Sequence, residues 1–422
     1  MKLALKGKKW LLSFLFALLL APSASAQDQV GGPLDLQALV KEAPERNPEV
    51  LAAKKKVEVA AARVPQARAL PDPQFGIEWE NTIDFKKAVE IEFALSQTIP
   101  FPGKLRLKGE VAQKEVEQAR AEYLGKQMEI MSKVKVAYYQ FFLAFKAIEI
   151  KQEEIKLIET FSKIAQTKYA VGTAIQQDVL KAQTILATLL NDLVTLEQER
   201  ETAAAALNTL LNRPPDSPLG QPVTSEVPRF TYTIDQLQRL ALENRADLQA
   251  ARFNIERGEV ARALANRQYY PDFSIGLQYA RNLLGGAKNK DKWEPTISIN
   301  IPWLWTRERY DYQVQEAVAQ IEAARAAEQA IKNRALFEIK DLTVKIQAAE
   351  RLANLYKTAI LPLATQTLNV STASYQTGQV DFLTLVDNLR TLRAVEIAYY
   401  QSLVSFHQRV ADLELTVGLE LR

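Results

Sequence analysis

Apolar side chains recur at helical spacing along most of this chain, and two of the helical stretches are unusually long. Residues 104 to 168 contain two glycines and no proline, and apolar residues recur there every three or four positions. At 1.5 Å per residue, one continuous helix over this stretch would extend about 100 Å. A second long pattern runs from 307 to 374. Ordinary globular domains do not hold helices of this length, so the pattern predicts an elongated molecule.

Shorter helical patterns follow the two long ones, at about 173–212 and 380–418, and others precede them at 48–70 and 245–269. In each half, the two shorter helices placed end to end match the long helix in length. Apolar residues of the return helices recur every seven positions, which predicts left-handed coiled-coil packing. The two series are Leu385, Leu392, Tyr399, Phe406 and Leu413, and Val179, Leu186, Leu193 and Leu207 with Arg200 interrupting them.

Four segments alternate apolar and polar residues strictly, at about 74–82, 88–98, 273–281 and 295–301. Alternation of this kind is typical of strands with one apolar face, including the half-buried sheets of soluble proteins. Here each segment is close to the ~9 to 11 residues that a tilted strand needs to cross a bilayer. Aromatic residues, where a membrane interface would hold them, end the segments: Trp79, Phe101, Trp303 and Trp305. The pattern therefore favours a membrane β-barrel.

Four strands leave two open sheet edges. Unpaired backbone groups in hydrocarbon cost several kcal/mol each, so one copy of the chain could not remain in a membrane by itself. The chain is therefore predicted to share a barrel with identical copies. Two copies would supply the eight strands of the smallest known barrels and three would supply twelve, and strand counting does not decide between them.

The same order of elements occurs twice, which predicts two internal structural repeats. Asn47-Pro48-Glu49-Val50-Leu51 reappears in outline as Arg245-Ala246-Asp247-Leu248-Gln249, and Pro71-Asp72 reappears as Pro271-Asp272. The first repeat covers 27–212 and the second covers 234–418. A proline-rich segment, 213–233, is predicted to link them.

The chain begins with a basic segment, a short apolar core and the small-residue sequence Ala24-Ser25-Ala26, which together predict a secretory signal peptide over 1–26. The apolar core falls short of the ~20 residues that span a membrane, and the pattern predicts no spanning helix after it. Removing the four leader lysines lowers Lys and Arg from 53 to 49, against 50 acidic residues. No concentrated basic face remains, so no nucleic-acid partner is expected.

Composition also argues against catalysis and metal binding by this chain. Cysteine is absent, His407 is the one histidine, and there are three methionines, so no soft-ligand metal cluster is expected. The sequence contains no phosphate-binding loop, dinucleotide fingerprint or nucleophile elbow. We therefore expect no enzyme activity, no cofactor and no metal site, and any transport must draw its energy from another protein.

Two related motifs end the long helices: Tyr169-Ala170-Val171-Gly172-Thr173, followed by Asp178-Val179, and Tyr375-Gln376-Thr377-Gly378-Gln379, followed by Val386-Asp387. With the duplicated layout, these motifs resemble the outer membrane efflux proteins, the TolC-like family, including its CzcC-like and CusC-like heavy-metal branch. The resemblance covers about residues 36 to 419. It implies an α+β membrane protein, a homotrimer in which a twelve-stranded barrel in outer-membrane lipid continues into a long coiled-coil helical tunnel in the periplasm.

The resemblance also implies partners and site residues. A periplasmic adaptor, coupled to an inner-membrane pump, would contact the tip of the tunnel. The matching tip residues are Tyr169, Val171, Gly172, Thr173, Tyr375, Gly378 and Gln379. Some members carry two acidic rings at a constriction; Asp387 matches one ring and Thr384 occupies the other position. The glycines also suit a tight reversal between helices whatever binds there, and Asp387 also suits a solvated coiled-coil face.

Two further hypotheses come from the residues themselves. The acidic strand faces would line the pore and favour cations over anions; these residues are Glu78, Glu80, Glu90 and Glu92. Pro362 removes a helix hydrogen bond and should kink the second long helix, which would help the tip to dilate.

The sequence thus predicts the outer-membrane exit duct, a passive channel, of a tripartite efflux system for small molecules or metal ions. A type I protein-secretion duct shares every feature above. A periplasmic coiled-coil scaffold or adaptor with a soluble sheet is the alternative of another class, and a passive porin would lack the long tunnel. The sequence does not distinguish the substrates, the adaptor or the energy source of the pump.

Overall fold

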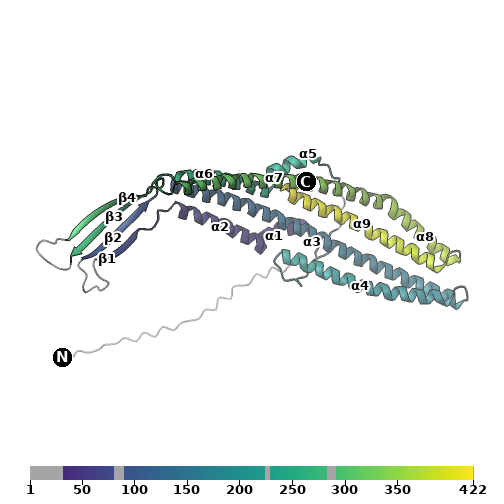
Figure 1. The fold of residues 1–422 in the computed structure, drawn as a ribbon. Helices are drawn as coiled ribbons and strands as arrows, with labels where there is room; N and C mark the ends of the chain where they lie inside the picture. The colour runs from purple at the N-terminus through teal and green to yellow at the C-terminus, as the bar shows by residue number, and fades with distance from the viewer. Residues whose placement is uncertain (1–31, 80–89, 224–228, 283–290, 422) are drawn as a thin grey trace, which may run out of the picture.

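A computed structural model describes residues 32–79, 90–223, 229–282 and 291–421 of this protein (Figure 1). The predicted signal peptide and Glu80 lie outside these ranges. The molecule is elongated, with a sheet at one end and long helices running from it to a tip at the other end (Figure 1). Elements occur in the same order in both halves: two short helices, two strands, a long helical stretch and a return helix.

The helices agree closely with the sequence pattern. The longest, α3, has 67 residues without interruption, about 100 Å at the rise of an α-helix. The first half contains α1 (Leu36–Arg46), α2 (Pro48–Arg68), α3 (Lys104–Ala170) and α4 (Gln176–Leu210). The second contains α5 (Ile234–Asn244), α6 (Ala246–Arg267), α7 (Arg307–Leu355), a π-helical segment (Tyr356–Ile360), α8 (Leu361–Thr377) and α9 (Phe382–Val417).

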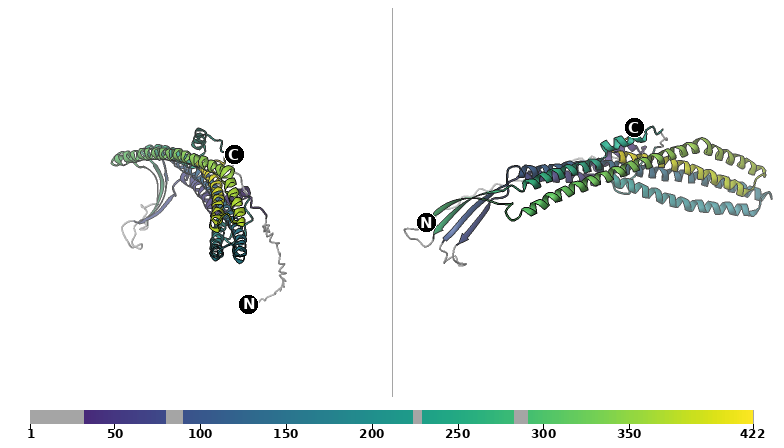
Figure 2. Two further views of the ribbon diagram at one scale, coloured as in Figure 1. Left: turned by 90° about the vertical axis from the view of Figure 1, so that its right-hand side faces the viewer. Right: turned by 45° about the horizontal axis from the view of Figure 1, so that its top comes forward.

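The second long stretch is divided where the sequence predicts a kink at Pro362. Proline has no N–H to donate, and its ring clashes with the carbonyl of the preceding turn in a regular α-helix. Here Leu361, one residue earlier, donates its backbone N–H to the carbonyl of Tyr356, five residues back. This wider turn is the π segment, and α8 then continues toward the tip (Figure 2). The structure thus accommodates Pro362 by inserting a π turn.

The four strands form one antiparallel sheet in the order β1-β2-β3-β4. Their bounds are β1 Gln74–Trp79, β2 Glu90–Ile99, β3 Phe273–Asn282 and β4 Lys292–Ile299. Strand β4 begins and ends earlier than the sequence pattern predicts. It ends at Ile299 because the side chain of Asn300 turns back to accept the backbone N–H of Asp272.

Strand β4 includes Pro295, which cannot donate a ladder hydrogen bond. The backbone N–H of Asn300 donates to the carbonyl of Asp272 at 3.3 Å, so these two residues lie at a hydrogen-bonded position of the ladder, with the Asn300 side chain accepting the return bond. Such positions alternate along an antiparallel ladder, which makes Leu277 and Pro295 a non-hydrogen-bonded pair. The nitrogen of Pro295 therefore faces the open edge of the sheet, where proline is tolerated.

Apart from α5, which lies outside it, the helices pack side by side in one layer that continues the sheet (Figures 1 and 2). Near the sheet, α2 packs on α3, α3 on α6, and α6 on α7. Toward the tip, α4 packs on α3, α3 on α9, and α9 on α8. In the tip half, α4 and α8 are thus the two edges of the layer.

This arrangement explains how far the predicted heptad positions are buried. In α9, Leu385, Leu392, Phe406 and Leu413 are buried, because α9 has neighbours on both sides. The corresponding residues Val179, Leu186 and Leu193 of α4 are only half-buried. Because α4 lies at the edge of the layer, it buries a narrower face than α9 does, and Ala182, Ile185 and Leu189 on that face pack toward α3.

Helix α4 also has the length and composition of a membrane-spanning helix, which the sequence pattern does not predict after the leader. An 18-residue window within Gln176–Leu210 has a mean hydropathy of 1.3, and 17% of that window is buried. The helix instead lies along α3 in the tip half of the layer. Much of its apolar surface therefore remains exposed in a single copy of the chain.

A buried ion pair joins the two halves where the sheet meets the helices. Lys104, 2% exposed at the start of α3, lies 2.8 Å from the carboxylate of Asp272 and donates to the carbonyl of Tyr270. The same carboxylate accepts the backbone N–H of Phe101 at 2.8 Å. The guanidinium of Arg267 lies 5.5 Å and 5.2 Å from the ring centres of Phe101 and Tyr270, which stack on each other.

Candidate functional site

Two turns at the tip have the same backbone geometry. Gly172 and Gly378 adopt positive φ angles of 77° and 81°. The residues after them, Thr173 and Gln379, donate to the carbonyls of Lys168 and Ser374, each at 2.8 Å. This six-to-one hydrogen bond together with a left-handed glycine is a Schellman motif, which ends a helix and reverses the chain. The glycines are required because other residues disfavour this φ region.

Most of the predicted tip residues face solvent. Tyr169 and Val171 are 47% and 68% exposed. Gly172, Thr173, Gly378 and Gln379 are also exposed. Tyr375 differs, because its side chain is 4% exposed and packs against Phe382. Both lie in the apolar core between two helical hairpins, one formed by α3 and α4 and the other by α8 and α9. The first turn therefore offers apolar side chains to a partner, and the second offers mainly backbone and Gln379.

The two hairpins are joined at the tip through Tyr375. The ammonium group of Lys168, from the last turn of α3, donates to the carbonyl oxygen of Tyr375 and lies 4.7 Å from the centre of its ring. Among the described residues, the Tyr375 hydroxyl has no hydrogen-bond partner. Its pKa is raised by burial and by the nearby charge of Asp178. The sequence gives no signal for this contact, which joins residues 207 positions apart.

Two carboxylates from different hairpins also approach each other near the tip. Burial, and then the charge of Asp381, raise the pKa of Asp178 in the first turn of α4. Asp381 caps α9 by accepting the backbone N–H of Thr384 at 3.2 Å, and hydrogen bonding to Thr384 lowers the pKa of Asp381. Folding therefore raises the pKa of Asp178 and lowers the pKa of Asp381.

Asp387, the predicted constriction residue, lies on the exposed side of α9 between buried neighbours Val386 and Leu389. Thr384 is exposed on the same helix. In a single copy, Asp387 thus has the solvated position that either a pore-lining or a surface carboxylate requires.

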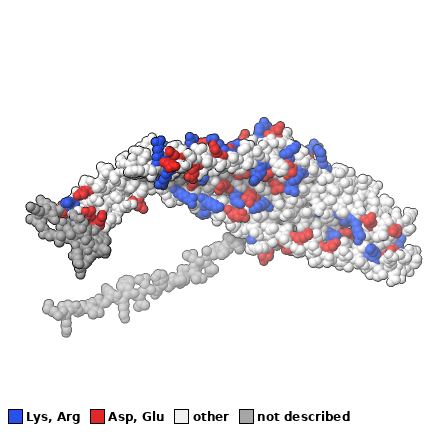
Figure 3. Space-filling model, viewed as in Figure 1, with Lys and Arg blue, Asp and Glu red and all other residues white. Residues whose placement is uncertain are grey.

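The sheet has one apolar and one polar face. Apolar side chains at alternate positions are exposed by 36% to 79%; they are Phe75, Ile77, Phe93, Leu95, Ile99, Phe273, Ile275, Leu277, Trp293, Ile297 and Ile299. On the face seen in Figure 3, charged side chains are absent from the strands except toward their far end. A large exposed apolar surface marks a contact with membrane or protein.

The polar face brings two predicted acidic residues together. Glu78 in β1 lies directly opposite Glu92 in β2, and Glu92 lies opposite Ala280 in β3. Lys292 in β4 pairs with Ala280 and so belongs to the same row. Glu90 lies opposite Asn282 in the register, and Glu80 lies outside the described residues. Charge on this face is thus concentrated at the end of the sheet away from the helices.

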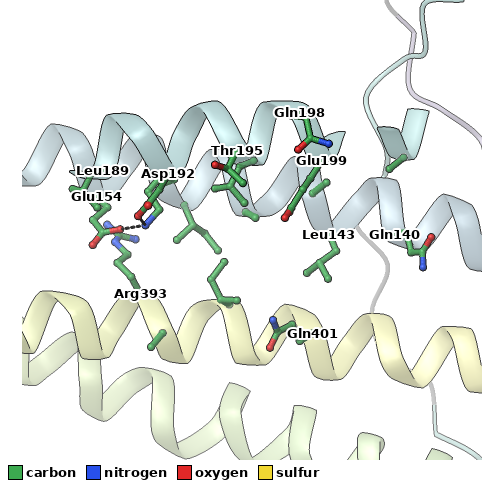
Figure 4. A pocket seen from close by; sticks show the side chains of 18 of the residues that line it. Gln140, Leu143, Glu154, Leu189, Asp192, Thr195, Gln198, Glu199, Arg393 and Gln401 are labelled. Atoms are coloured by element: carbon green, nitrogen blue, oxygen red, sulfur yellow. Dashed lines mark hydrogen bonds and ion pairs between the residues drawn. The ribbon is translucent and has the colours of Figure 1, made fainter. Parts of the chain in front are cut away.

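A cavity of about 1030 Å³ lies between α3, α4 and α9 (Figure 4). At one end Lys151 lies 3.0 Å from Glu154 and 3.4 Å from Asp192 of α4. Arg393 extends from α9 into the same end and lies 3.1 Å from Glu153. These ion pairs hold three helices together across an otherwise mostly apolar cavity.

The described residues include no group of three or more His, Asp or Glu side chains that could hold a metal ion. His407 stacks on the ring of Tyr139, with centroids 4.4 Å apart, and makes an edge contact with Phe406. These aromatic contacts place His407 within the packing of α3 against α9.

Comparison with known proteins agrees with this architecture. The family model described as outer membrane efflux protein matches residues 39–213 and 237–419, one match in each half. A cobalt-zinc-cadmium resistance protein, CzcC, of Cupriavidus metallidurans is 23% identical over 398 residues, covering 92% of this chain and 91% of that protein.

Solved structures with the same fold cover nearly the whole chain. The outer membrane protein VceC of Vibrio cholerae superposes with a TM-score of 0.75 at 20% identity, covering 92% of this chain and 97% of that one. A structure of CusC, described in terms of folding and transmembrane channel formation, superposes with a TM-score of 0.79 at 19% identity, covering 91% and 92%.

Proposed function

This chain belongs to the outer membrane efflux protein family, and we propose that three copies of it form the exit duct of a tripartite efflux assembly. The observation that carries the proposal is the sheet. Its apolar face is exposed, its other face is polar, and both of its edges are open. A sheet of this kind is stable in lipid only when other strands close it into a barrel.

Three copies would give a closed barrel of twelve strands. The apolar face would contact outer-membrane lipid and the polar face would line a water-filled pore. The open edges belong to β1 and β4, so β4 of one copy would pair with β1 of the next. The same operation would place the helical layers side by side and continue the pore as a coiled-coil tunnel in the periplasm. The two halves of the chain would be two copies of one structural repeat. The signal peptide over 1–26 would direct export of the chain.

The duct would be passive. In this proposal a periplasmic adaptor contacts the exposed tip residues Tyr169, Val171, Thr173 and Gln379, and an inner-membrane pump supplies the energy. Gly172 and Gly378 would shape the contacting turns, and Tyr375 would support the surface from within the core. Three copies of Asp387 would form one acidic ring near the tip.

We propose divalent metal cations among the substrates. The name of the Cupriavidus relative concerns cobalt, zinc and cadmium resistance. The acidic pair Glu78 and Glu92 on the polar face of the sheet would raise the local concentration of cations in the pore. No coordination by the duct is needed for this, since selection would take place at the pump.

The test is to express the full chain in a Gram-negative host and fractionate the membranes. The duct should be extracted from the outer membrane only with detergent, run as a trimer, and conduct ions in planar bilayers. A chain found as a monomer in detergent-free periplasmic extract would overturn the proposal in favour of a scaffold. Export of a polypeptide, without a change in metal or drug tolerance on deletion, would instead identify a type I secretion duct.

A further inference from the structure

The two edge helices of the tip half each expose an apolar stripe. On α4, Leu180 and Val194 are 55% and 66% exposed, and Ala187 between them is also exposed. These three residues are spaced by seven, which returns to nearly the same side of a helix. They lie roughly opposite Ala182, Ile185 and Leu189, which pack toward α3. The stripe therefore faces away from the rest of the chain.

The opposite edge carries a matching stripe on α7 and α8. Leu355, Leu363 and Val370 are 49%, 64% and 59% exposed. Leu363 and Val370 are spaced by seven, but Leu355 and Leu363 are spaced by eight. Helix α8 contains no charged residue along its whole length.

The additional residue lies at the π segment. A π turn holds one more residue than an α turn, so it delays the helical phase by one position. Between Leu355 and Leu363 the chain passes through Tyr356–Ile360, where Leu361 bonds five residues back to Tyr356. A spacing of eight across this segment is therefore equivalent to a spacing of seven elsewhere. The π turn keeps Leu363 and Val370 on the side of Leu355 after Pro362.

The two stripes also match in height above the tip. Leu180 follows Gly172 by eight residues, and Val370 precedes Gly378 by eight. Ala187 and Leu363 each lie fifteen residues from those glycines. Val194 lies 22 residues from Gly172 and Leu355 lies 23 from Gly378, and the difference of one is the residue that the π turn adds.

We propose that these stripes are the two halves of one seam between copies of this chain, with α8 and the end of α7 of one copy packed against α4 of the next. The π segment Tyr356–Ile360 sets the register of this seam. The inference rests on the proposed function, which supplies the neighbouring copy. It is favoured by the matched heights and by continuity, because the open strands β1 and β4 lie on the same two sides as α4 and α8 (Figures 1 and 2).

Disulfide crosslinking tests the seam directly, because the natural chain contains no cysteine. The pair L180C and V370C should give a covalent ladder up to trimer on denaturing gels after oxidation of the detergent-solubilised protein. Within one copy the two helices lie on opposite edges of the layer, whereas a disulfide requires Cα atoms within about 7 Å. Two single-cysteine chains carrying tags of different size, when co-expressed, should give the mixed dimer.

The matched control is A187C with V370C, which shifts the pair by two turns, or about 10 Å. It should crosslink at least tenfold more slowly than L180C with V370C. Equal rates for the two pairs, or no ladder from either, would overturn the seam. If lipid or adaptor protects these cysteines from thiol modification and no covalent trimer forms, the stripes contact another partner. That result would also overturn the seam.

The role of the π segment has two tests. In the intact chain, V194C with L355C should crosslink as well as L180C with V370C, which requires the additional residue on the α8 side. P362A, which keeps the additional residue and restores the missing N–H, should remove the π turn and rotate Leu363 and Val370 by about 100° relative to Leu355. The pair nearer the tip should then lose its crosslink and the V194C–L355C pair should keep it. Deleting Thr358 as well as introducing P362A restores a spacing of seven and should recover the crosslink near the tip. Unchanged crosslinking near the tip with P362A alone would overturn the register role.

The outcomes separate this inference from the proposed function. A trimer that needs detergent and conducts ions, but gives no ladder from L180C with V370C, overturns the seam and leaves the duct intact. A water-soluble monomer overturns both.

Discussion

The ammonium group of Lys168, at the end of α3, donates to the carbonyl oxygen of Tyr375 near the end of α8 and lies over the same residue's ring. This contact joins the two hairpins where their turns meet, and it combines a charge-assisted hydrogen bond with a cation–π contact. The tip is therefore held together by specific contacts as well as by the apolar core below it.

Lys168→Met should loosen the tip while preserving the apolar length of the side chain. The loss of both contacts should cost about 1 kcal/mol, since each is partly exposed to water. Hydrogen exchange of backbone amides in 372–380 should accelerate about fivefold, whereas Lys163→Met, on an exposed face of the same helix, should leave it unchanged. Equal exchange in the two variants would contradict the link.

Tyr375→Phe should stabilise the chain slightly. The Tyr375 hydroxyl is buried and has no hydrogen-bond partner among the described residues, so its removal should relieve a desolvation cost of about 1 kcal/mol. Tyr375→Ala should instead destabilise by about 3 kcal/mol, because it leaves a cavity beside Phe382. Denaturant unfolding of both variants measures these changes, and a destabilised phenylalanine variant would mean that the hydroxyl has a partner in the assembly.

The stability of the tip should depend on pH through Asp178. A carboxyl whose pKa is raised on folding binds its proton more tightly in the folded state. Stability is therefore lost as the pH rises from the ordinary carboxyl pKa of 3.8 through the raised pKa of Asp178, and the loss is complete above that raised pKa. Asp178→Asn should be more stable than the natural chain near neutral pH, and the advantage should vanish near pH 3.

Asp381→Asn provides the matched control for Asp178. Asparagine keeps the N-cap of α9 but removes the charge that raises the pKa of Asp178. Because Asp381 itself has a lowered pKa and contributes its own pH dependence, the comparison is made within this variant: the stabilisation by Asp178→Asn near neutral pH should be smaller there than in the natural chain. Equal stabilisation in the two backgrounds would show that burial of Asp178, without Asp381, sets the effect.

The junction between sheet and helices should depend on the buried pair of Lys104 and Asp272. Lys104→Met leaves the carboxylate of Asp272 without its cation and should destabilise the chain by about 3 kcal/mol. Lys104→Met combined with Asp272→Leu should recover much of that loss, because no uncompensated charge remains. A double-mutant cycle by chemical denaturation measures the coupling, and additive effects would argue against it.

Neutralising the acidic pair of the sheet should reduce the preference of the pore for cations. Glu78→Gln with Glu92→Gln removes two carboxylates per copy from the polar face, and the reversal potential in a salt gradient should shift toward zero. Glu58→Gln, on an exposed face of α2, is the control and should leave the reversal potential unchanged. Anion preference in the natural channel would exclude the acidic lining.

Local physics explains why so much of the fold could be predicted from the sequence. The repeat of apolar residues every three or four positions determined α3, and strict alternation determined β1 to β3, because these periods reflect the geometry of each element. Glycine determined both tip turns, since few other residues adopt the φ of Gly172 and Gly378.

The tertiary structure decided what depends on distant neighbours. The family resemblance implies that Tyr375 belongs to the contacting tip, but packing against Phe382 buries its side chain, and the approach of α3 places Lys168 at its carbonyl. The unequal burial of the heptad positions in α4 and α9 follows from which helix lies at the edge of the layer. The π turn before Pro362 depends on which carbonyls can accept bonds in the folded helix. Periodicity determines which face of an element is apolar, and only the packing of the whole chain determines what covers that face.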